Sequence, residues 1–140
     1  MPHIQVWIHY VWSTKNREPF LTKKVRPEII DHLKKNAQEK EIHLDFIGGY
    51  VDHLHSLISM KSGQQIEAIA QMLKGESSHW INKNKICQGY FGWQDEYFAA
   101  SVSPPDVPAV RRYIANQEEH HKKVSFQSEF KYLLQRAGFE

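Results

Sequence analysis

The order in which two apolar patterns follow one another limits the folds that this chain can adopt. Runs rich in β-branched and aromatic residues predict strands, and apolar residues at helical spacing beneath a charged face predict helices. In chain order we predict a strand over 4–12, a helix over 26–39, strands over 42–47 and 50–59, a helix over 66–83, and one strand or two short ones within 90–103. This β-α-β-β-α-β order is that of the ferredoxin-like split β-α-β fold, an α+β fold in which two helices back one antiparallel sheet.

Two further helices are predicted after the sheet. The pair Pro104 and Pro105 ends the last strand, because proline has no backbone N–H to donate. Asp106 is suited to the N-cap of a helix over about 107–122. Apolar residues at helical spacing predict a short C-terminal helix over 125–137.

The length and composition indicate a single domain. A chain of 140 residues can bury one core and is short for two, so we assign residues 1–140 to one domain. No apolar run is long enough to span a bilayer and no signal-peptide pattern is evident, so we expect a cytoplasmic protein with no membrane partner. The single cysteine, Cys87, excludes an internal disulfide and a thiolate zinc cage. Any metal site must therefore use histidine, carboxylate or amide ligands.

Two histidines interrupt the apolar strand predicted at 50–59. His53 and His55 are two residues apart, and alternate side chains of a strand lie on the same face. The two imidazoles would therefore lie side by side, as two ligands of a metal ion do. Histidines packed in the core of an ordinary strand are the alternative interpretation.

A second candidate site lies on the helix predicted at 107–122. Tyr113 and Gln117 are four residues apart and share a helical face. A phenol beside a divalent metal and flanked by guanidinium groups, here Arg111 and Arg112, could act as a nucleophile towards phosphorus. A tyrosine that only packs is the alternative. Two histidines follow at 120–121, and they could relay the phenol proton or only complement the partial charge at the helix end.

Basic residues gather locally, although the net charge is only +2. Clusters of lysine and arginine beside aromatic rings suit single-stranded nucleic acid, in which phosphates need counter-charges and bases stack. A solvated surface is the alternative for each cluster. The candidates for contacts with a DNA backbone are Lys15, Arg17, Lys74, Lys83, Lys85, Arg111 and Arg112.

Four short motifs in the same order resemble one family over almost the whole chain. They are Trp12-x-Thr14-Lys15-x-Arg17, His53-Leu54-His55, Trp93-Gln94-x-x-Tyr97 and Tyr113-Ile114-x-x-Gln117. Together they resemble the small single-tyrosine HUH transposases of insertion sequences, including their repeat-associated relatives. The predicted strand and helix order agrees with the fold of that family.

The resemblance implies a function and a role for each matching residue. His53, His55 and Gln117 would hold a divalent cation, Mg²⁺ or Mn²⁺, and Tyr113 would be the nucleophile. Such enzymes cut single-stranded DNA at ends marked by hairpins and form a 5′-phosphotyrosine link. They work as homodimers, commonly with the tyrosine helix of one subunit completing the metal site of the other, and the linker 103–105 could let that helix leave its own sheet.

Other functions compete with this interpretation. A ferredoxin-like sheet can also bind single-stranded nucleic acid without catalysis, using exposed aromatic residues on its central strands, where this chain has His53 and His55. A histidine-triad hydrolase would require a third histidine at position 57, which is leucine. The usual motif of a zinc deaminase is absent. Replication initiators and relaxases use similar chemistry, but they are usually larger.

Overall fold

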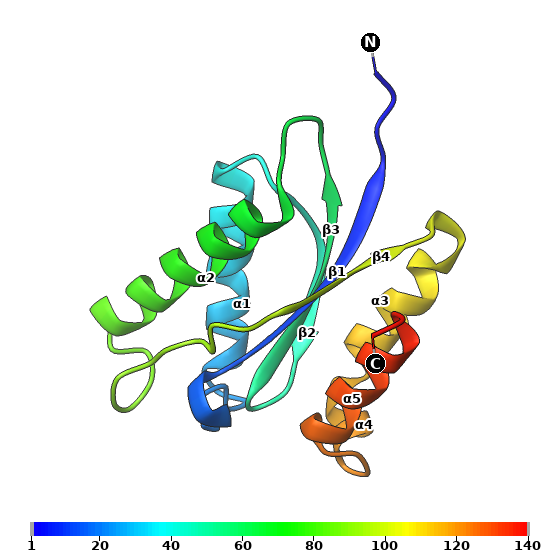
Figure 1. The fold of residues 1–140 in the computed structure, drawn as a ribbon. Helices are drawn as coiled ribbons and strands as arrows, with labels where there is room; N and C mark the ends of the chain where they lie inside the picture. The colour runs from blue at the N-terminus through cyan, green and yellow to red at the C-terminus, as the bar shows by residue number, and fades with distance from the viewer. Residues whose placement is uncertain (1, 140) are drawn as a thin grey trace.

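The computed structural model describes residues 2–139 and contains one four-stranded antiparallel sheet (Figure 1). Its strands lie in the order β2-β3-β1-β4, so β3 and β1 are central. The strands are β1 (Val6–Ser13), β2 (His43–Gly49), β3 (His53–Met60) and β4 (Phe98–Val102). Together with the order of the helices, this topology confirms the predicted ferredoxin-like fold with additional C-terminal helices.

Helices cover both faces of the sheet, which makes three layers (Figure 1). The helices α1 (Arg26–Glu39) and α2 (Ile66–Lys83) lie on one face and pack against each other. The other face is covered by α3 (Val107–Ala115), α4 (Gln117–His121) and α5 (Phe126–Arg136). Two short 3₁₀ helices, η1 (Lys15–Arg17) and η2 (Pro104–Asp106), follow β1 and β4. Within residues 2–139, no helix combines the length and the apolar character that crossing a bilayer would require.

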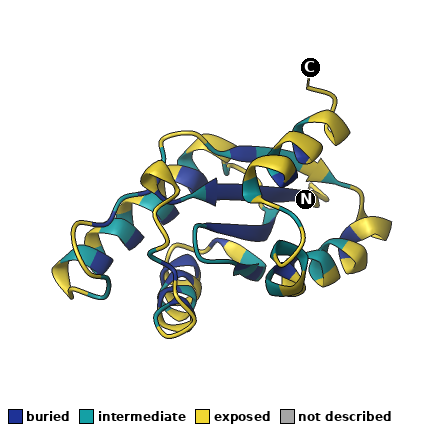
Figure 2. Cartoon of the chain, turned by 90° about the horizontal axis from the view of Figure 1, so that it is seen from below, coloured by how far each residue is buried: buried dark blue, intermediate teal, exposed yellow. Residues whose placement is uncertain are grey.

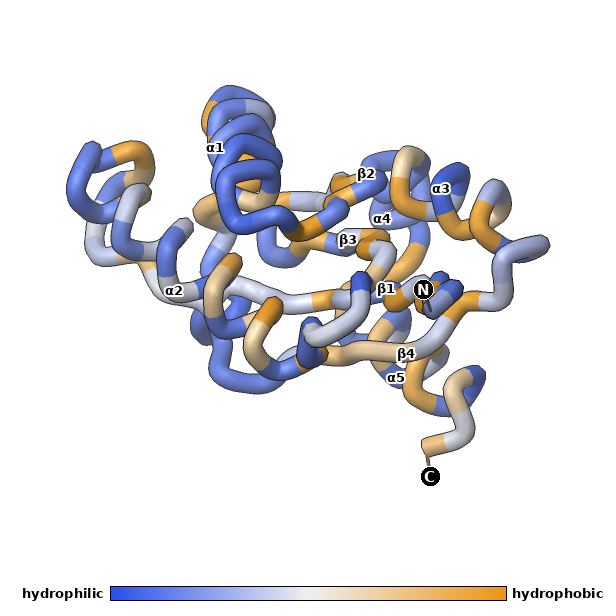
Figure 3. The backbone as a smooth tube through the Cα atoms, turned by 90° about the horizontal axis from the view of Figure 1, so that it is seen from above, coloured by the Kyte–Doolittle hydropathy of each residue, from blue (hydrophilic) through white to orange (hydrophobic). Residues whose placement is uncertain are grey.

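The main hydrophobic core lies between the sheet and the pair α1 and α2. Alternate residues of β1, including Tyr10 and Trp12, are fully buried there against Leu33 of α1 and Leu73 of α2. Figure 2 shows the central strands as the most continuously buried part of the chain. In Figure 3, α1 is largely hydrophilic with hydrophobic residues in short stretches, as expected for a helix that buries one side only.

The opposite face of the sheet has two smaller apolar clusters instead of one continuous core. Trp7 and Leu57 pack under α3, and Val11 packs with Phe98 and with Leu133 of α5. Between these clusters the sheet presents histidines to α3, α4 and α5. The helices on this face therefore enclose polar groups, which need partners when they are buried.

The structure corrects three details of the sequence interpretation. Residues 90–92 form no strand, and Trp93 makes only an isolated bridge to Thr14. Asp106 precedes α3, but its side chain makes no capping hydrogen bond. The helix expected over 107–122 is interrupted at Asn116, whose short amide side chain competes with helical hydrogen bonds.

Candidate active site

The strand β3 places His53 and His55 together on the face that α3, α4 and α5 cover. Both side chains are fully buried, and their ring centroids are 5.1 Å apart. The period of two along a strand explains their shared face, and the antiparallel neighbours on both sides hold β3 in place. The two imidazoles thus lie side by side, as the sequence predicts.

Each of these imidazoles has a partner at its Nδ1 atom. The Asp52 carboxylate accepts a hydrogen bond from Nδ1 of His53 at 2.8 Å, and Nε2 of His9 lies 2.9 Å from Nδ1 of His55. Such partners orient the ring and direct the Nε2 atom at the site. Burial lowers the pKa of His55 to about 4, and burial and then the charge of His55 lower the pKa of His9 to about 3. His9 and His55 are therefore neutral near pH 7, and a histidine must be neutral to bind a metal.

The helix α4 brings Gln117 to the same place. Its amide nitrogen donates to Glu129 Oε2 at 2.9 Å, which fixes the orientation of the amide because only the nitrogen can donate. Its Oε1 atom therefore lies towards the imidazoles, 2.8 Å from Nε2 of His53 and 3.0 Å from Nε2 of His121.

The pKa of His53 is raised. Burial opposes the charged form of this imidazole, but hydrogen bonds to Asp52 and Glu129 outweigh the effect of burial.

Tyr113 of α3 lies beside the two histidines of its own chain. Its ring centroid is 5.5 Å from that of His55, and its hydroxyl donates a hydrogen bond to the Glu129 carboxylate. Burial and then this hydrogen bond raise the pKa of the phenol well above its usual value, so the hydroxyl is protonated in this arrangement. The structure thus brings Tyr113, His53, His55 and Gln117 together in one subunit.

Glu129 of α5 is the central group of this cluster, and the sequence interpretation missed it. Its side chain is fully buried, and its Oε1 atom lies 3.2 Å from Nε2 of His53 and 3.3 Å from Nε2 of His55. Burial alone would raise the pKa of this carboxyl, but hydrogen bonds from the two histidines hold it far below its usual value. A signal was present: Glu129 lies three residues after Phe126 and four before Leu133, which places a carboxylate on the apolar face of its helix.

The sequence interpretation also misses His9, and it gives His121 only two roles, that of a proton relay and that of a group that complements the helix end. His9 occupies an inward position of β1 between Trp7 and Val11, so the period of two could have pointed to it. His121 Nε2 lies 3.0 Å from Oε1 of Glu129. Burial and then the charge of His53 lower its pKa. No residue spacing links either histidine to β3, because the tertiary fold makes that contact.

The donor atoms in this cluster are suited to a divalent cation. His53, His55 and Glu129 each offer a ligand atom, and these atoms lie within 4.8 Å of one another. His120, His121 and Glu129 form a second, more exposed group of this kind. Two imidazole nitrogens with carboxylate and amide oxygens suit Mg²⁺, Mn²⁺ or a later transition metal. The residues present therefore fit a metal site.

Comparison with protein families decides the kind of protein that carries this site. Residues 3–117 match the model of the IS200-like transposases. The chain belongs to this family. The matched span includes His53, His55, Tyr113 and Gln117 and ends before Glu129.

Solved structures agree with the fold of this transposase. A candidate transposase from Deinococcus radiodurans R1 is 23% identical, with a TM-score of 0.66, and the match covers 83% of this chain and 93% of that one. A REP-associated tyrosine transposase bound to a REP hairpin is 13% identical, with a TM-score of 0.66, and the match covers 89% and 73% of the two chains. No curated protein matches the chain at a significant level.

Two ion pairs fix the helices that carry the site of the transposase. Arg111 of α3 donates to both carboxylate oxygens of Asp45 at 2.7 and 2.8 Å, and Asp45 lies at an irregularity of β2. The buried Arg26 of α1 pairs with Glu118 of α4, next to Gln117. Arg111 is thus engaged within the protein, where it holds α3 against the sheet.

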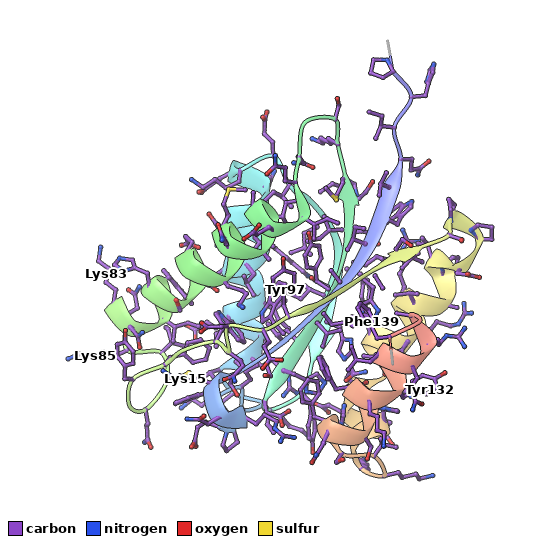
Figure 4. The ribbon with its side chains drawn as sticks, viewed as in Figure 1. Lys15, Lys83, Lys85, Tyr97, Tyr132 and Phe139 are labelled. Atoms are coloured by element: carbon purple, nitrogen blue, oxygen red, sulfur yellow. The ribbon has the colours of Figure 1, made fainter. Side chains whose placement is uncertain are left out.

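The other predicted DNA contacts lie in several places. Lys74 donates to two backbone carbonyls at 2.6 and 3.0 Å. Lys83 and Lys85 lie around the end of α2, on the far side of the sheet from α3 and α5, and Lys15 lies at the base of β1 (Figure 4). Arg17 is exposed at the end of η1. The structure therefore does not bring this basic set together around Tyr113.

An open cleft leads to Tyr113 between β4, α3 and α5. Its volume is about 460 Å³. His9, Tyr113, Tyr132 and Arg136 are among the residues that line it, and Tyr132 points outward in Figure 4. Arg112 lies beside Tyr113 along a second, more open hollow. Tyr113 therefore borders two open hollows.

Proposed function

We propose that this transposase cleaves and rejoins single-stranded DNA at hairpin-marked ends through a metal-assisted 5′-phosphotyrosine intermediate. One observation carries the proposal: the Tyr113 hydroxyl and the Nε2 atoms of His53 and His55 meet at the same buried carboxylate, Glu129. A tyrosine that served only for packing would not need its hydroxyl on the carboxylate that two imidazoles share.

The proposed cleavage exchanges one phosphate ester for another. The phenol oxygen of Tyr113 attacks the scissile phosphorus, the bond from phosphorus to the 3′-oxygen breaks, and that oxygen takes a proton from water to become a 3′-hydroxyl. Glu129 accepts the hydrogen bond of the hydroxyl and so orients it, and the phenol proton leaves to solvent as the new phosphorus–oxygen bond forms. His120 Nε2 lies 3.4 Å from the same carboxylate oxygen and is partly exposed, so it offers a path for the proton to solvent.

The remaining side chains would hold the reacting groups in place. His53, His55 and Gln117 would hold Mg²⁺ or Mn²⁺, which when bound supplies positive charge to a non-bridging phosphate oxygen. Asp52 and His9 hold the two imidazoles in orientation. Because the phosphotyrosine ester conserves the energy of the broken phosphodiester, a 3′-hydroxyl can attack it and rejoin the DNA without nucleotide hydrolysis.

The proposed partners are single-stranded DNA with a hairpin and a second copy of the chain. The structural neighbour bound to a REP hairpin supports the DNA partner. We further propose that the protein works in the cytoplasm as a homodimer. The remaining candidates for contacts with the DNA backbone outside the site are Lys15, Arg17, Lys74, Lys83, Lys85 and Arg112.

A cleavage assay with matched variants tests this function. Wild-type protein with Mn²⁺ and a labelled hairpin-bearing DNA strand should form a covalent complex that survives denaturing electrophoresis. Tyr113→Phe should form none while binding the DNA nearly as well, and His53→Ala should lose the metal-dependent cleavage. Tyr90→Phe removes an exposed tyrosine away from the site and should behave as wild type. DNA binding by the wild type without any covalent complex would indicate a nucleic-acid-binding module instead.

A further inference from the structure

The two oxygens of Glu129 have different partners. Oε1 lies 3.2 Å from Nε2 of His53 and 3.3 Å from Nε2 of His55. Oε2 accepts hydrogen bonds from the Tyr113 hydroxyl and, at 2.9 Å, from the Gln117 amide. One side of the carboxylate therefore lies against the imidazoles, and the other side lies against the phenol.

The spacing of these atoms matches that of ligands around one cation. Ligands about 2.1 Å from an octahedral ion lie about 3.0 Å from their nearest neighbours. The separations from Glu129 Oε1 to the two imidazole nitrogens are 3.2 and 3.3 Å, and His53 Nε2 lies 2.8 Å from Gln117 Oε1. These four atoms thus have the spacing of a shared coordination shell.

The charges of the cluster favour the same conclusion. Imidazoles and an amide bring no negative charge, whereas Mg²⁺ and Mn²⁺ bind best where a carboxylate oxygen is among the ligands. Glu129 is the fully buried carboxylate of this cluster. A cation bound beside this carboxylate, which has no solvent exposure, would balance its charge.

We propose that Glu129 is a ligand of the divalent cation together with His53, His55 and Gln117, and that its second oxygen positions the Tyr113 hydroxyl. The ligand comes from α5, which lies outside the span matched by the family model. The C-terminal helix would thus complete the metal site and align the nucleophile through one side chain. This inference rests on the proposed function only in requiring that a divalent cation binds at the two histidines.

Calorimetric titration of the full chain with Mn²⁺ tests the ligand. Glu129→Gln keeps the size of the side chain but removes its charge, and it should raise the Kd for Mn²⁺ by about tenfold or more. The control Glu119→Gln removes an exposed carboxylate of α4 that pairs with Lys122, and its Kd should stay within about twofold of wild type. An unchanged Kd in Glu129→Gln would overturn the proposal, as would a lower Kd, which would show that the Glu129 carboxylate opposes binding of the cation.

A measurement on wild-type protein covers the case in which Glu129→Gln does not fold. In protein labelled with ¹³C in its glutamate side chains, saturating Mg²⁺ should shift the carboxyl signal of Glu129 and leave that of the exposed Glu119 in place. A Glu129 carboxyl signal that does not move while the imidazole signals of His53 and His55 shift would overturn the proposal. Neither experiment requires DNA, so each can succeed even if Tyr113→Phe shows that the proposed cleavage chemistry is wrong.

Discussion

Gly48 of β2 lies in direct contact with the backbone of Ile114 in α3. A Cβ atom at Gly48 would lie 3.0 Å from the Ile114 carbonyl oxygen and 3.1 Å from its Cγ2 atom, and Gly48 pairs with His55 across the sheet. The absence of a side chain there lets α3 approach the strand beside the histidines. Tyr113, which precedes Ile114, is thereby brought close to His55.

Replacing Gly48 by alanine should displace α3. The overpacked contact should cost about 1–3 kcal/mol in the free energy of unfolding, and the shift of Tyr113 should slow formation of the covalent complex by about tenfold or more. Gly75→Ala is the matched control, because nothing lies within 4 Å of its added Cβ and alanine favours a helix. Urea unfolding and a timed cleavage assay measure both effects; a Gly48→Ala protein as active as wild type would contradict the role of this contact.

Asp52→Asn should weaken metal binding while leaving the protein folded. The substitution removes the carboxylate that accepts from Nδ1 of His53, and the loss of such a partner typically lowers metal affinity by about 10–100-fold. Titration with Mn²⁺ measures the change. Asp31→Asn, on the exposed surface of α1, serves as the control, and equal affinities for the two variants would show that Asp52 does not support the site.

Metal-free protein should lose stability as the pH falls from about 6.5 towards 4. In the folded state the pKa values of His9 and His55 are lowered to about 3 and about 4 from 6.5, so in this range the unfolded chain binds protons that the folded chain does not. Each group can then lower the free energy of unfolding by up to about 1.4 kcal/mol per pH unit. The raised pKa of His53 acts in the opposite direction only above about pH 6.5, because below that value it is protonated in both states.

Urea unfolding in EDTA at pH 7, 6 and 5 measures this dependence. His9→Gln removes one of the two groups, so the free energy of unfolding should fall less steeply with decreasing pH in that variant. Equal stability of the wild type at pH 7 and pH 5 would contradict the buried, neutral state of these histidines.

The sequence was sufficient to predict the parts of the fold that depend on local periodicity. The helix over 26–39 has the predicted bounds, because its apolar residues recur regularly and its ends are clear. The period of two placed His53 and His55 on one face of β3, and this inference needed no knowledge of which helix packs against which strand. The position of Tyr113 and Gln117 beside these histidines was implied by the resemblance to the transposase family.

The rest of the site depends on contacts between distant segments. His9 and Glu129 reach His55 from β1 and α5, and no spacing in the sequence relates these positions. The basic residues show the same limit of the sequence. Arg111 has the kind of side chain expected of a DNA contact, yet it pairs with Asp45. Charge alone does not distinguish an ion pair within the protein from a free cation on its surface.

The site forms within one chain, which leads to a prediction about mixed subunits. Tyr113 and His55 of the same subunit lie with ring centroids 5.5 Å apart. A mixture of Tyr113→Phe and His53→Ala proteins should therefore remain inactive in the cleavage assay, since neither chain has a complete site. Recovery of activity in the mixture would show that the tyrosine helix is exchanged between subunits.

The most direct measurement is the identification of the residue that is joined to DNA. After cleavage of a hairpin-bearing strand, digestion with nuclease and trypsin should leave a nucleotide on the peptide of residues 113–122, in which Tyr113 is the only tyrosine. Mass spectrometry should find the added mass on that tyrosine in wild-type protein and on no peptide of Tyr113→Phe. A nucleotide on any other residue, or cleavage with no modified peptide, would contradict the account.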